Sequence, residues 1–259
     1  MAEADTLESS RLDSDDPGLP TMSFLEHLED LRRRLLYSIV SLAVAFLACW
    51  NYAREIYAWL EHPLVQFLPP GDKLAFTSVT TPFFLYMKVA FFAGIFVASP
   101  IILWQLWLFI APGLYPREKR MSLPFILFAT LFFLIGGYFG YRVVLPMAAK
   151  FFVEMGSGFK QVITVDDYFD FSSKLILGMG LVFETPVLIL FLSIFGIVTP
   201  QFLLSKFKYA VVLIFIIAAV ITPTPDMVTQ SALAVPMILL YLFGIAISYV
   251  FGKKPDKPE

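Results

Sequence analysis

Cysteine, histidine and charged residues are all scarce in this sequence of 259 residues. The single cysteine, Cys49, excludes an intrachain disulfide framework, and we expect it to be a small packing residue. The two histidines, His27 and His62, are far apart and have no acids or cysteines at ligand spacing, so no metal and no other cofactor is expected. The chain also lacks G-x-S-x-G, a phosphate-binding loop and H-E-x-x-H, which indicates that it is not an enzyme.

Hydrophobic residues make up 58% of the chain, charged residues only 15%, and the mean hydropathy is +0.76. These values exclude an ordinary soluble domain and predict an all-α polytopic membrane protein, since a bilayer-spanning helix needs roughly 20 mostly apolar residues. Residues 22–252 form the predicted membrane domain, between an acidic tail (1–21) that we expect to be disordered and a basic tail (253–259). Six spans are predicted, at about 32–51, 82–110, 121–145, 171–198, 207–221 and 227–251.

The basic residues gather at every second junction between the apolar segments. The groups are Arg32 to Arg34; Arg117, Lys119 and Arg120; Lys206 and Lys208; and Lys253, Lys254 and Lys257. Because cytoplasmic loops keep an excess of Lys and Arg, this pattern places both termini in the cytoplasm. The acid-rich first twenty residues resemble neither a signal peptide nor a transit peptide, which favours the plasma (inner) membrane of a bacterium.

The fifth and sixth predicted spans differ from the others in length or polarity. Residues 209–221 are the only uninterrupted apolar run of the fifth, and the tight turn 222–226 (TPTPD) separates it from the sixth. Such a hairpin is short for a hydrocarbon core of ~30 Å. Alternatively, residues 202–208 extend the fifth span as an interfacial helix.

Glu184 lies within the fourth predicted span, near the middle of the bilayer. An ionisable group at this depth costs a few kcal/mol and usually faces a cavity or a partner. One interpretation is a polar contact for a ligand or a partner helix. The other is a protonated glutamate that bonds to a neighbouring helix, near Gln230 or Thr229.

Two carboxylates lie among cations at predicted cytoplasmic ends of spans. Glu118 follows Pro116 at a helix start, where a carboxylate satisfies free amides, and Asp30 is spaced to pair with Arg34, as Glu29 is with Arg33. Taken together, Asp30 and Glu118 suggest a paired site for a dicationic ligand. A guanidinium can donate two parallel hydrogen bonds to a carboxylate, which an ammonium cannot reproduce.

Several segments, in this order, carry a resemblance to a known family. They are residues 27–34 (HLEDLRRR), 99–115 (SPIILWQLWLFIAPGLY), 183–186 (FETP), 222–226 (TPTPD), Gln230 and 234–237 (AVPM). With these segments the chain resembles TatC, the signal-peptide receptor subunit of the twin-arginine protein translocase. The resemblance implies a cupped bundle of six helices that binds signal peptides with two adjacent arginines on folded proteins. It also implies single-span TatA-type and TatB-type partners in a hetero- and homo-oligomer, export driven by the proton gradient, and no binding of nucleic acid.

The resemblance also implies roles for individual residues. Glu118 and Asp30 match the two carboxylates that contact the twin arginines, although the family usually has Glu at the position of Asp30, and Phe109 lies beside them. Glu184 and Gln230 match polar positions that meet partners in the membrane. Asp226 matches an acid at the outer end of a span, although its position at a helix start offers a purely structural explanation as well. Two alternatives from other classes are a small proton-coupled secondary transporter that uses Glu184 and a purely structural scaffold. Secondary transporters usually contain repeats with broken helices, which this sequence does not show.

Overall fold

The computed structural model describes residues 24–68, 73–110, 122–222 and 226–252. Within these ranges the chain is helical, and the one contact of β type is an isolated parallel bridge between Ala75 and Thr164. Because a bilayer offers no hydrogen-bonding partner to the backbone, apolar spans must bond internally, and a helix does this within one segment. The all-helical class that the sequence predicts is therefore confirmed for these residues.

Five helical stretches are long and apolar enough to cross a membrane. They are Leu25–Trp50, Thr81–Phe109, Leu123–Met155, Val165–Ile194 and Met227–Phe251. A shorter apolar helix, α10 (Phe207–Ile221), has 15 residues and measures about 22 Å at 1.5 Å per residue. It is preceded by α9 (Pro200–Ser205), which is separated from α10 at Lys206.

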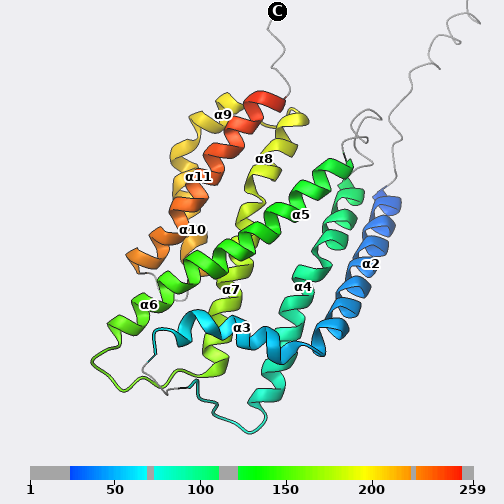
Figure 1. The fold of residues 1–259 in the computed structure, drawn as a ribbon. Helices are drawn as coiled ribbons and strands as arrows, with labels where there is room; N and C mark the ends of the chain where they lie inside the picture. The colour runs from blue at the N-terminus through cyan, green and yellow to red at the C-terminus, as the bar shows by residue number, and fades with distance from the viewer. Residues whose placement is uncertain (1–23, 69–72, 111–121, 223–225, 253–259) are drawn as a thin grey trace, which may run out of the picture.

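The first two long helices form one edge of the molecule. Helix α2 (Phe24–Trp50) packs along α4 (Thr81–Ile110), and α4 continues through Pro100 without interruption. Between them α3 (Ala53–Val65) lies across one end of the bundle (Figure 1). The hydroxyl of Tyr141 donates to the carbonyl of Trp59 and that of Tyr168 to the carbonyl of Leu60, both at 2.8 Å. These bonds fix α3 to the bundle.

The third long helix extends further than the sequence suggests. Helix α5 (Ser122–Phe139) passes through a π-helical turn, η3 (Gly140–Val144), and continues as α6 (Leu145–Met155). The sequence predicts a third span that ends near Leu145, directly before Pro146. Pro146 directly follows the π-helical turn, where the N–H of Leu145 bonds to the carbonyl of Gly140, so the regular i→i−4 pattern is already interrupted at the point where the proline lacks its N–H.

The fourth long stretch is broken at Glu184. Helix α7 (Val165–Phe183) ends there, and α8 (Thr185–Ile194) begins with Pro186 in its first turn. Helix α11 (Met227–Phe251) packs against α8 and α10. The starts of α2 and α9 and the end of α11 lie at one end of the bundle, opposite to α3 (Figure 1).

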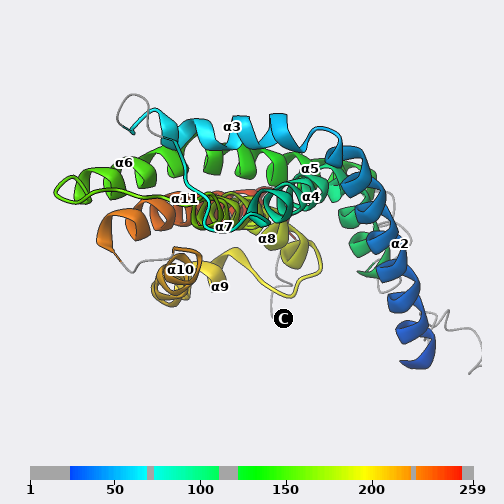
Figure 2. The same cartoon turned by 90° about the horizontal axis from the view of Figure 1, so that it is seen from below.

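Seen along the bundle, the helices form a curved layer (Figure 2). Helices α2 and α10 project to the same side of the layer that contains α4, α5, α7 and α11, while α3 covers the other side. Two apolar clusters hold the layer. One joins Cys49 to buried residues of α3, α4, α6 and α7, and the other joins α7 to α10 and α11. The expectation that Cys49 is a packing residue is confirmed.

Candidate functional site

The start of α2 and the end of α4 meet through two aromatic rings. His27 stacks on Phe109 with ring centroids 4.4 Å apart and an interplanar angle of 22°. Phe109 is partly buried, and it is followed almost directly by residues 111–121, which lie outside the described chain and contain Glu118. The contact brings Phe109 to the turn of α2 that precedes Asp30.

Asp30 is held by its own helix. Arg34 donates through Nε to Oδ2 of Asp30 at 2.7 Å, and the side chain of Arg34 is only 21% exposed and that of Asp30 only 17%. The i,i+4 pair that the sequence predicts is thus confirmed. The prediction of an equivalent ion pair between Glu29 and Arg33 is wrong, because Arg33 donates to the hydroxyl of Tyr37 at 3.4 Å and lies over the ring of that tyrosine.

Glu184 occupies the break between α7 and α8. Its carbonyl accepts from Leu188 at 2.8 Å, but its side-chain Oε1 is buried without a hydrogen-bond partner among the described residues. The two partners that the sequence suggested are engaged elsewhere: Gln230 donates through Nε2 to the carbonyl of Phe215 at 2.9 Å, and Thr229 bonds to Asp226. The interpretation of Glu184 as bonded to either of them is therefore wrong.

Asp226 begins α11 as its N-cap residue. Its Oδ1 accepts from the backbone N–H of Thr229 at 2.8 Å, and its Oδ2 interacts with the hydroxyl of the same threonine. A cap of this kind satisfies one of the free amides at a helix start. The structural role of Asp226 at the start of the helix is confirmed, and Gln230, one turn later, ties α11 to α10.

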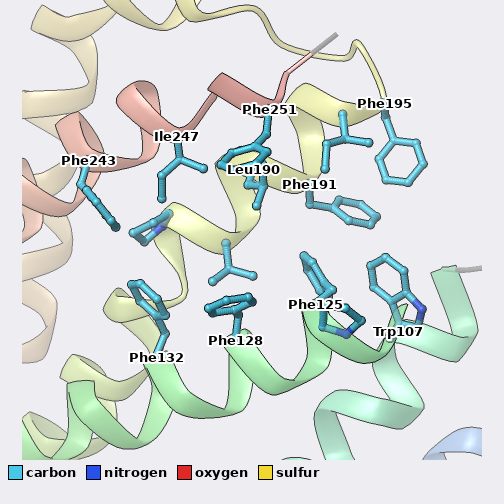
Figure 3. A pocket seen from close by; sticks show the side chains of 14 residues that line it. Trp107, Phe125, Phe128, Phe132, Leu190, Phe191, Phe195, Phe243, Ile247 and Phe251 are labelled. Atoms are coloured by element: carbon cyan, nitrogen blue, oxygen red, sulfur yellow. The ribbon is translucent and has the colours of Figure 1, made fainter. Parts of the chain in front are cut away.

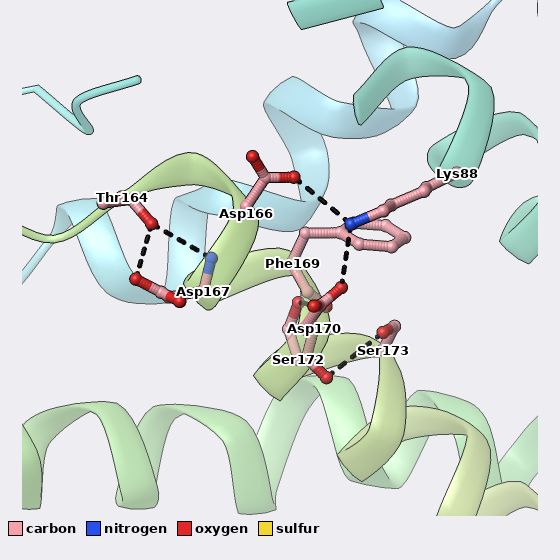
Figure 4. Close-up of polar contacts among 8 residues, drawn as sticks. All are labelled: Lys88, Thr164, Asp166, Asp167, Phe169, Asp170, Ser172 and Ser173. Carbon is pink, nitrogen blue, oxygen red and sulfur yellow. Dashed lines mark hydrogen bonds and ion pairs between the residues drawn. The ribbon is translucent and has the colours of Figure 1, made fainter. Parts of the chain in front are cut away.

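A cluster at the α3 end of the bundle was missed by sequence reasoning. Lys88 of α4 reaches two aspartates of α7, with its Nζ at 3.2 Å from Asp166 and 3.3 Å from Asp170 (Figure 4). Thr164 caps α7 by accepting from the N–H of Asp167. Lys88 and Asp170 are 82 positions apart in the chain, so only the spacing of the two aspartates on one helix face was readable in advance.

A second missed feature is an apolar cavity of about 320 Å³ between α5, α8 and α11 (Figure 3). Aromatic rings supply most of its wall: Trp107, Phe125, Phe128, Phe132, Phe191, Phe195, Phe243 and Phe251. Trp107 is 5% exposed, and its indole N–H has no partner within the described ranges. Dispersed phenylalanines in a hydrophobic sequence gave no signal that distinguishes a cavity wall from a lipid-facing surface.

No group of three or more metal-ligating side chains gathers anywhere in the described chain. The fold, with its five helical stretches of membrane length within the described ranges, defines a multi-pass helical membrane protein. Residues 26–236 match the family described as Sec-independent protein translocase protein (TatC).

Relatives with that name cover most of the chain. The protein of Koribacter versatilis (strain Ellin345) is 44% identical over 239 residues, 91% of this chain and 88% of its own length. That of Desulforapulum autotrophicum is 38% identical over 237 residues, 91% of this chain and 87% of its own length. A crystal structure of the twin-arginine translocase receptor TatC superimposes with a TM-score of 0.77 at 36% identity, and the match covers 87% of this chain and 99% of that one. The chain belongs to the TatC family. It is a component of the twin-arginine protein translocase, a transport receptor rather than an enzyme.

Proposed function

We propose that this chain is the subunit that recognises signal peptides with two adjacent arginines, and that Asp30, Glu118 and Phe109 form the docking site. The observation that carries the proposal is the stacking of His27 on Phe109, because it joins the helix of Asp30 to the helix that leads into the segment of Glu118. The signal peptides belong to folded proteins, whose export is driven by the proton gradient.

The chemistry of Asp30 suits a guanidinium. Arg34 engages its Oδ2, which leaves Oδ1 as the acceptor for an arginine of the peptide. Arg34 therefore orients the carboxylate and at the same time reduces its net charge. Because Asp30 is one methylene shorter than the glutamate usual in the family, we expect its contact with the peptide to be weaker than that of Glu118.

The topology that we propose has six spans, with α10 as a short fifth span and both termini in the cytoplasm of a bacterium whose inner membrane holds the protein. Support comes from the arrangement of the helices, since the start of α2 and the junction of α9 with α10 lie at the same end of the bundle (Figure 1). Arg32 to Arg34 belong to the first half of α2, and Lys206 is the residue between α9 and α10. A helix of about 22 Å is accommodated by local thinning of the bilayer at modest cost per Å.

The partners that we propose are TatA-type and TatB-type single-span proteins. Glu184 supports this proposal, since its buried Oε1 has no partner within the described chain and an intramembrane carboxylate is costly without one. We assign Gln230 and Asp226 to the same contact region, because α11 packs on α10 and that helix exposes apolar residues such as Val212 and Val220.

The alternative of a proton-coupled transporter also rests on Glu184. The break between α7 and α8 at this residue is the observation that favours it. Transporters of that kind typically have such breaks in both members of a repeated unit. Membership of a translocase family makes the receptor the better-supported function.

The test is photocrosslinking of membranes in which Phe109 is replaced by a photoreactive phenylalanine. We expect a twin-arginine signal peptide to be labelled and its twin-lysine version not to be. Glu118→Ala should abolish labelling, Asp30→Asn should weaken it by about 10- to 100-fold, and Asp30→Glu should strengthen it. Glu29→Gln is the matched control, because Glu29 is exposed and forms no ion pair with another described residue.

Equal labelling of the arginine and lysine peptides would refute the proposed docking site. Normal export of a strictly twin-arginine-dependent protein by Glu118→Ala would refute the role of Glu118.

A further inference from the structure

A second cavity lies at the α3 end of the bundle. It has a volume of about 720 Å³, is open to the surface, and is lined by residues 67–68 and 73–75 on one side and by residues from the interval 153–163 on the other. These segments directly precede the spans: Ala75 lies shortly before α4, and Ile163 lies two positions before α7 begins at Val165. The cavity therefore lies beside the ends of two membrane-length helices.

Hydrogen bonds between the two segments give the cavity a fixed wall. Ala75 donates its N–H to the carbonyl of Ile163 and accepts from the N–H of Val165, both at 2.9 Å. Gln161 donates through Nε2 to the carbonyl of Val153 at 2.8 Å, which ties the returning segment to the end of α6. The walls are thus positioned by two bonds between distant segments and by one bond within the interval 153–163.

The charge of the lining is predominantly positive. Lys73 and Lys160 both line the cavity, and neither takes part in an ion pair with a carboxylate of the described chain. The charge of Lys73 acts on Glu61 electrostatically, without a direct ion-pair contact between the two side chains. The one acidic residue of the lining, Glu154, is paired with Lys150 at 3.7 Å. Two ammonium groups without direct contact to a carboxylate of the described residues favour an anionic ligand.

Exposed apolar side chains around the cavity indicate that it faces the membrane interface. Phe159 is 81% exposed, Val162 is 64% exposed, and Val79, next to α4, is 92% exposed. Apolar and aromatic side chains just beyond a span are typical of residues that insert at the membrane interface, where the neighbouring molecules are phospholipids. The phosphate of such a lipid lies at the same level as basic side chains that flank a span.

We propose that this cavity is a binding site for an anionic phospholipid of the leaflet at the α3 end. Lys73 and Lys160 bind the phosphate of the headgroup, and the apolar wall, including Phe67, Leu74 and Val162, contacts the upper part of the acyl chains. The bound lipid anchors the α3 end of the bundle at the interface. The site is independent of the proposed docking of signal peptides, which takes place at the other end.

The experiment uses the full chain in nanodiscs with a photoreactive phenylalanine at Val162. Nanodiscs of phosphatidylcholine receive increasing fractions of radiolabelled phosphatidylglycerol, and in parallel of radiolabelled phosphatidylcholine with the same acyl chains. We expect saturable labelling by phosphatidylglycerol and only background labelling by phosphatidylcholine. The double variant Lys73→Gln/Lys160→Gln should raise the fraction of phosphatidylglycerol that gives half-maximal labelling roughly thirtyfold. Lys73→Arg/Lys160→Arg should preserve it.

The matched control is Lys206→Gln/Lys208→Gln, which removes two exposed lysines at the opposite end and should leave labelling at Val162 unchanged. Unchanged labelling in Lys73→Gln/Lys160→Gln, or equal labelling by the two lipids, would overturn the proposal. A further control adds inorganic phosphate, or chloride at equal ionic strength, to the nanodiscs. If phosphate abolished the labelling by phosphatidylglycerol and chloride did not, the site would bind free phosphate and the proposal would be overturned. Crosslinking to a second copy of the chain instead of lipid would assign the cavity to a protein interface.

Discussion

Gly136 lies where α5 crosses α7, and we expect Gly136→Ala to force the two helices apart. A Cβ atom at this position would lie 2.6 Å from the carbonyl oxygen of Met179 and 2.7 Å from Cβ of Phe183. Ordinary contacts of this kind are 3.4–4 Å. Met179 is fully buried, and its carbonyl belongs to the backbone, so the strain cannot be relieved by rotation of a side chain.

The expected loss of stability in Gly136→Ala follows from two opposing effects. Overpacking of a tight contact costs about 1–3 kcal/mol, and Gly136→Ala belongs to the upper part of that range, about 2–3 kcal/mol, because its Cβ would lie under 3.0 Å from a backbone oxygen. Alanine in turn favours a helix over glycine by about 1 kcal/mol. The net loss should be about 1–2 kcal/mol. For a chain of this size, that corresponds to a fall of roughly 2–8 °C in the apparent melting temperature.

The assay is thermal unfolding of the purified protein in detergent, with Gly158→Ala as the control. A Cβ at Gly158 meets nothing within 4 Å, and its backbone angle is not one that favours glycine. Because Phe183 adjoins the break at Glu184, Gly136→Ala should also reduce export. A melting temperature of Gly136→Ala equal to or above that of Gly158→Ala would refute the close crossing of α5 and α7.

Three further predictions concern other contacts. Lys88→Gln removes both ion pairs of α4 with α7. Because these groups are about one third to one half exposed, the loss of stability should stay below about 2 kcal/mol and should be smaller in high salt. Thermal unfolding at two salt concentrations measures both effects. His27→Ala removes the stacking on Phe109, worth about 0.5–1.5 kcal/mol, and should weaken twin-arginine binding about two- to tenfold, whereas His27→Phe should retain it in a peptide-binding assay. Burial raises the pKa of the Glu61 carboxyl from its ordinary value of 4.5, an effect that Lys73 partly opposes. The native state therefore holds this proton more tightly than the unfolded state, so the contribution of Glu61 to stability is full below pH 4.5 and is lost as the pH rises through the raised native pKa. Glu61→Gln should flatten this part of the pH–stability curve, and an identical slope in parent and variant would contradict the burial of Glu61.

The local elements of this protein were readable from local sequence. The apolar runs place the membrane-length helices, the spacing of Asp30 and Arg34 gives their ion pair, and the position of Asp226 before α11 gives its cap. Each of these depends on residues within a turn or two of one another. The continuation of α5 through η3 into α6 was missed, because a proline that follows a π-helical turn and a helix-breaking proline look the same in sequence.

Contacts between distant segments were not readable in this way. Three features each join residues that are tens of positions apart in the chain. They are the stacking of His27 on Phe109, the ion pairs of Lys88 with α7, and the cavity lined by Lys73 and Lys160. The partners first suggested for Glu184 were wrong for the same reason, since the packing of α10 on α11 commits Gln230 to a backbone carbonyl.

The sequence by itself therefore determined the class of the protein, its long helices and the carboxylates that are candidates for recognition. The physical reason is that apolar length and backbone hydrogen bonding force helices wherever a segment lies in lipid. Only the tertiary structure decided which faces of those helices meet. Close packing of small and aromatic residues selects one arrangement among many that are equally apolar. That selection placed Phe109 beside the helix of Asp30 and left the carboxylate of Glu184 buried at a helix break.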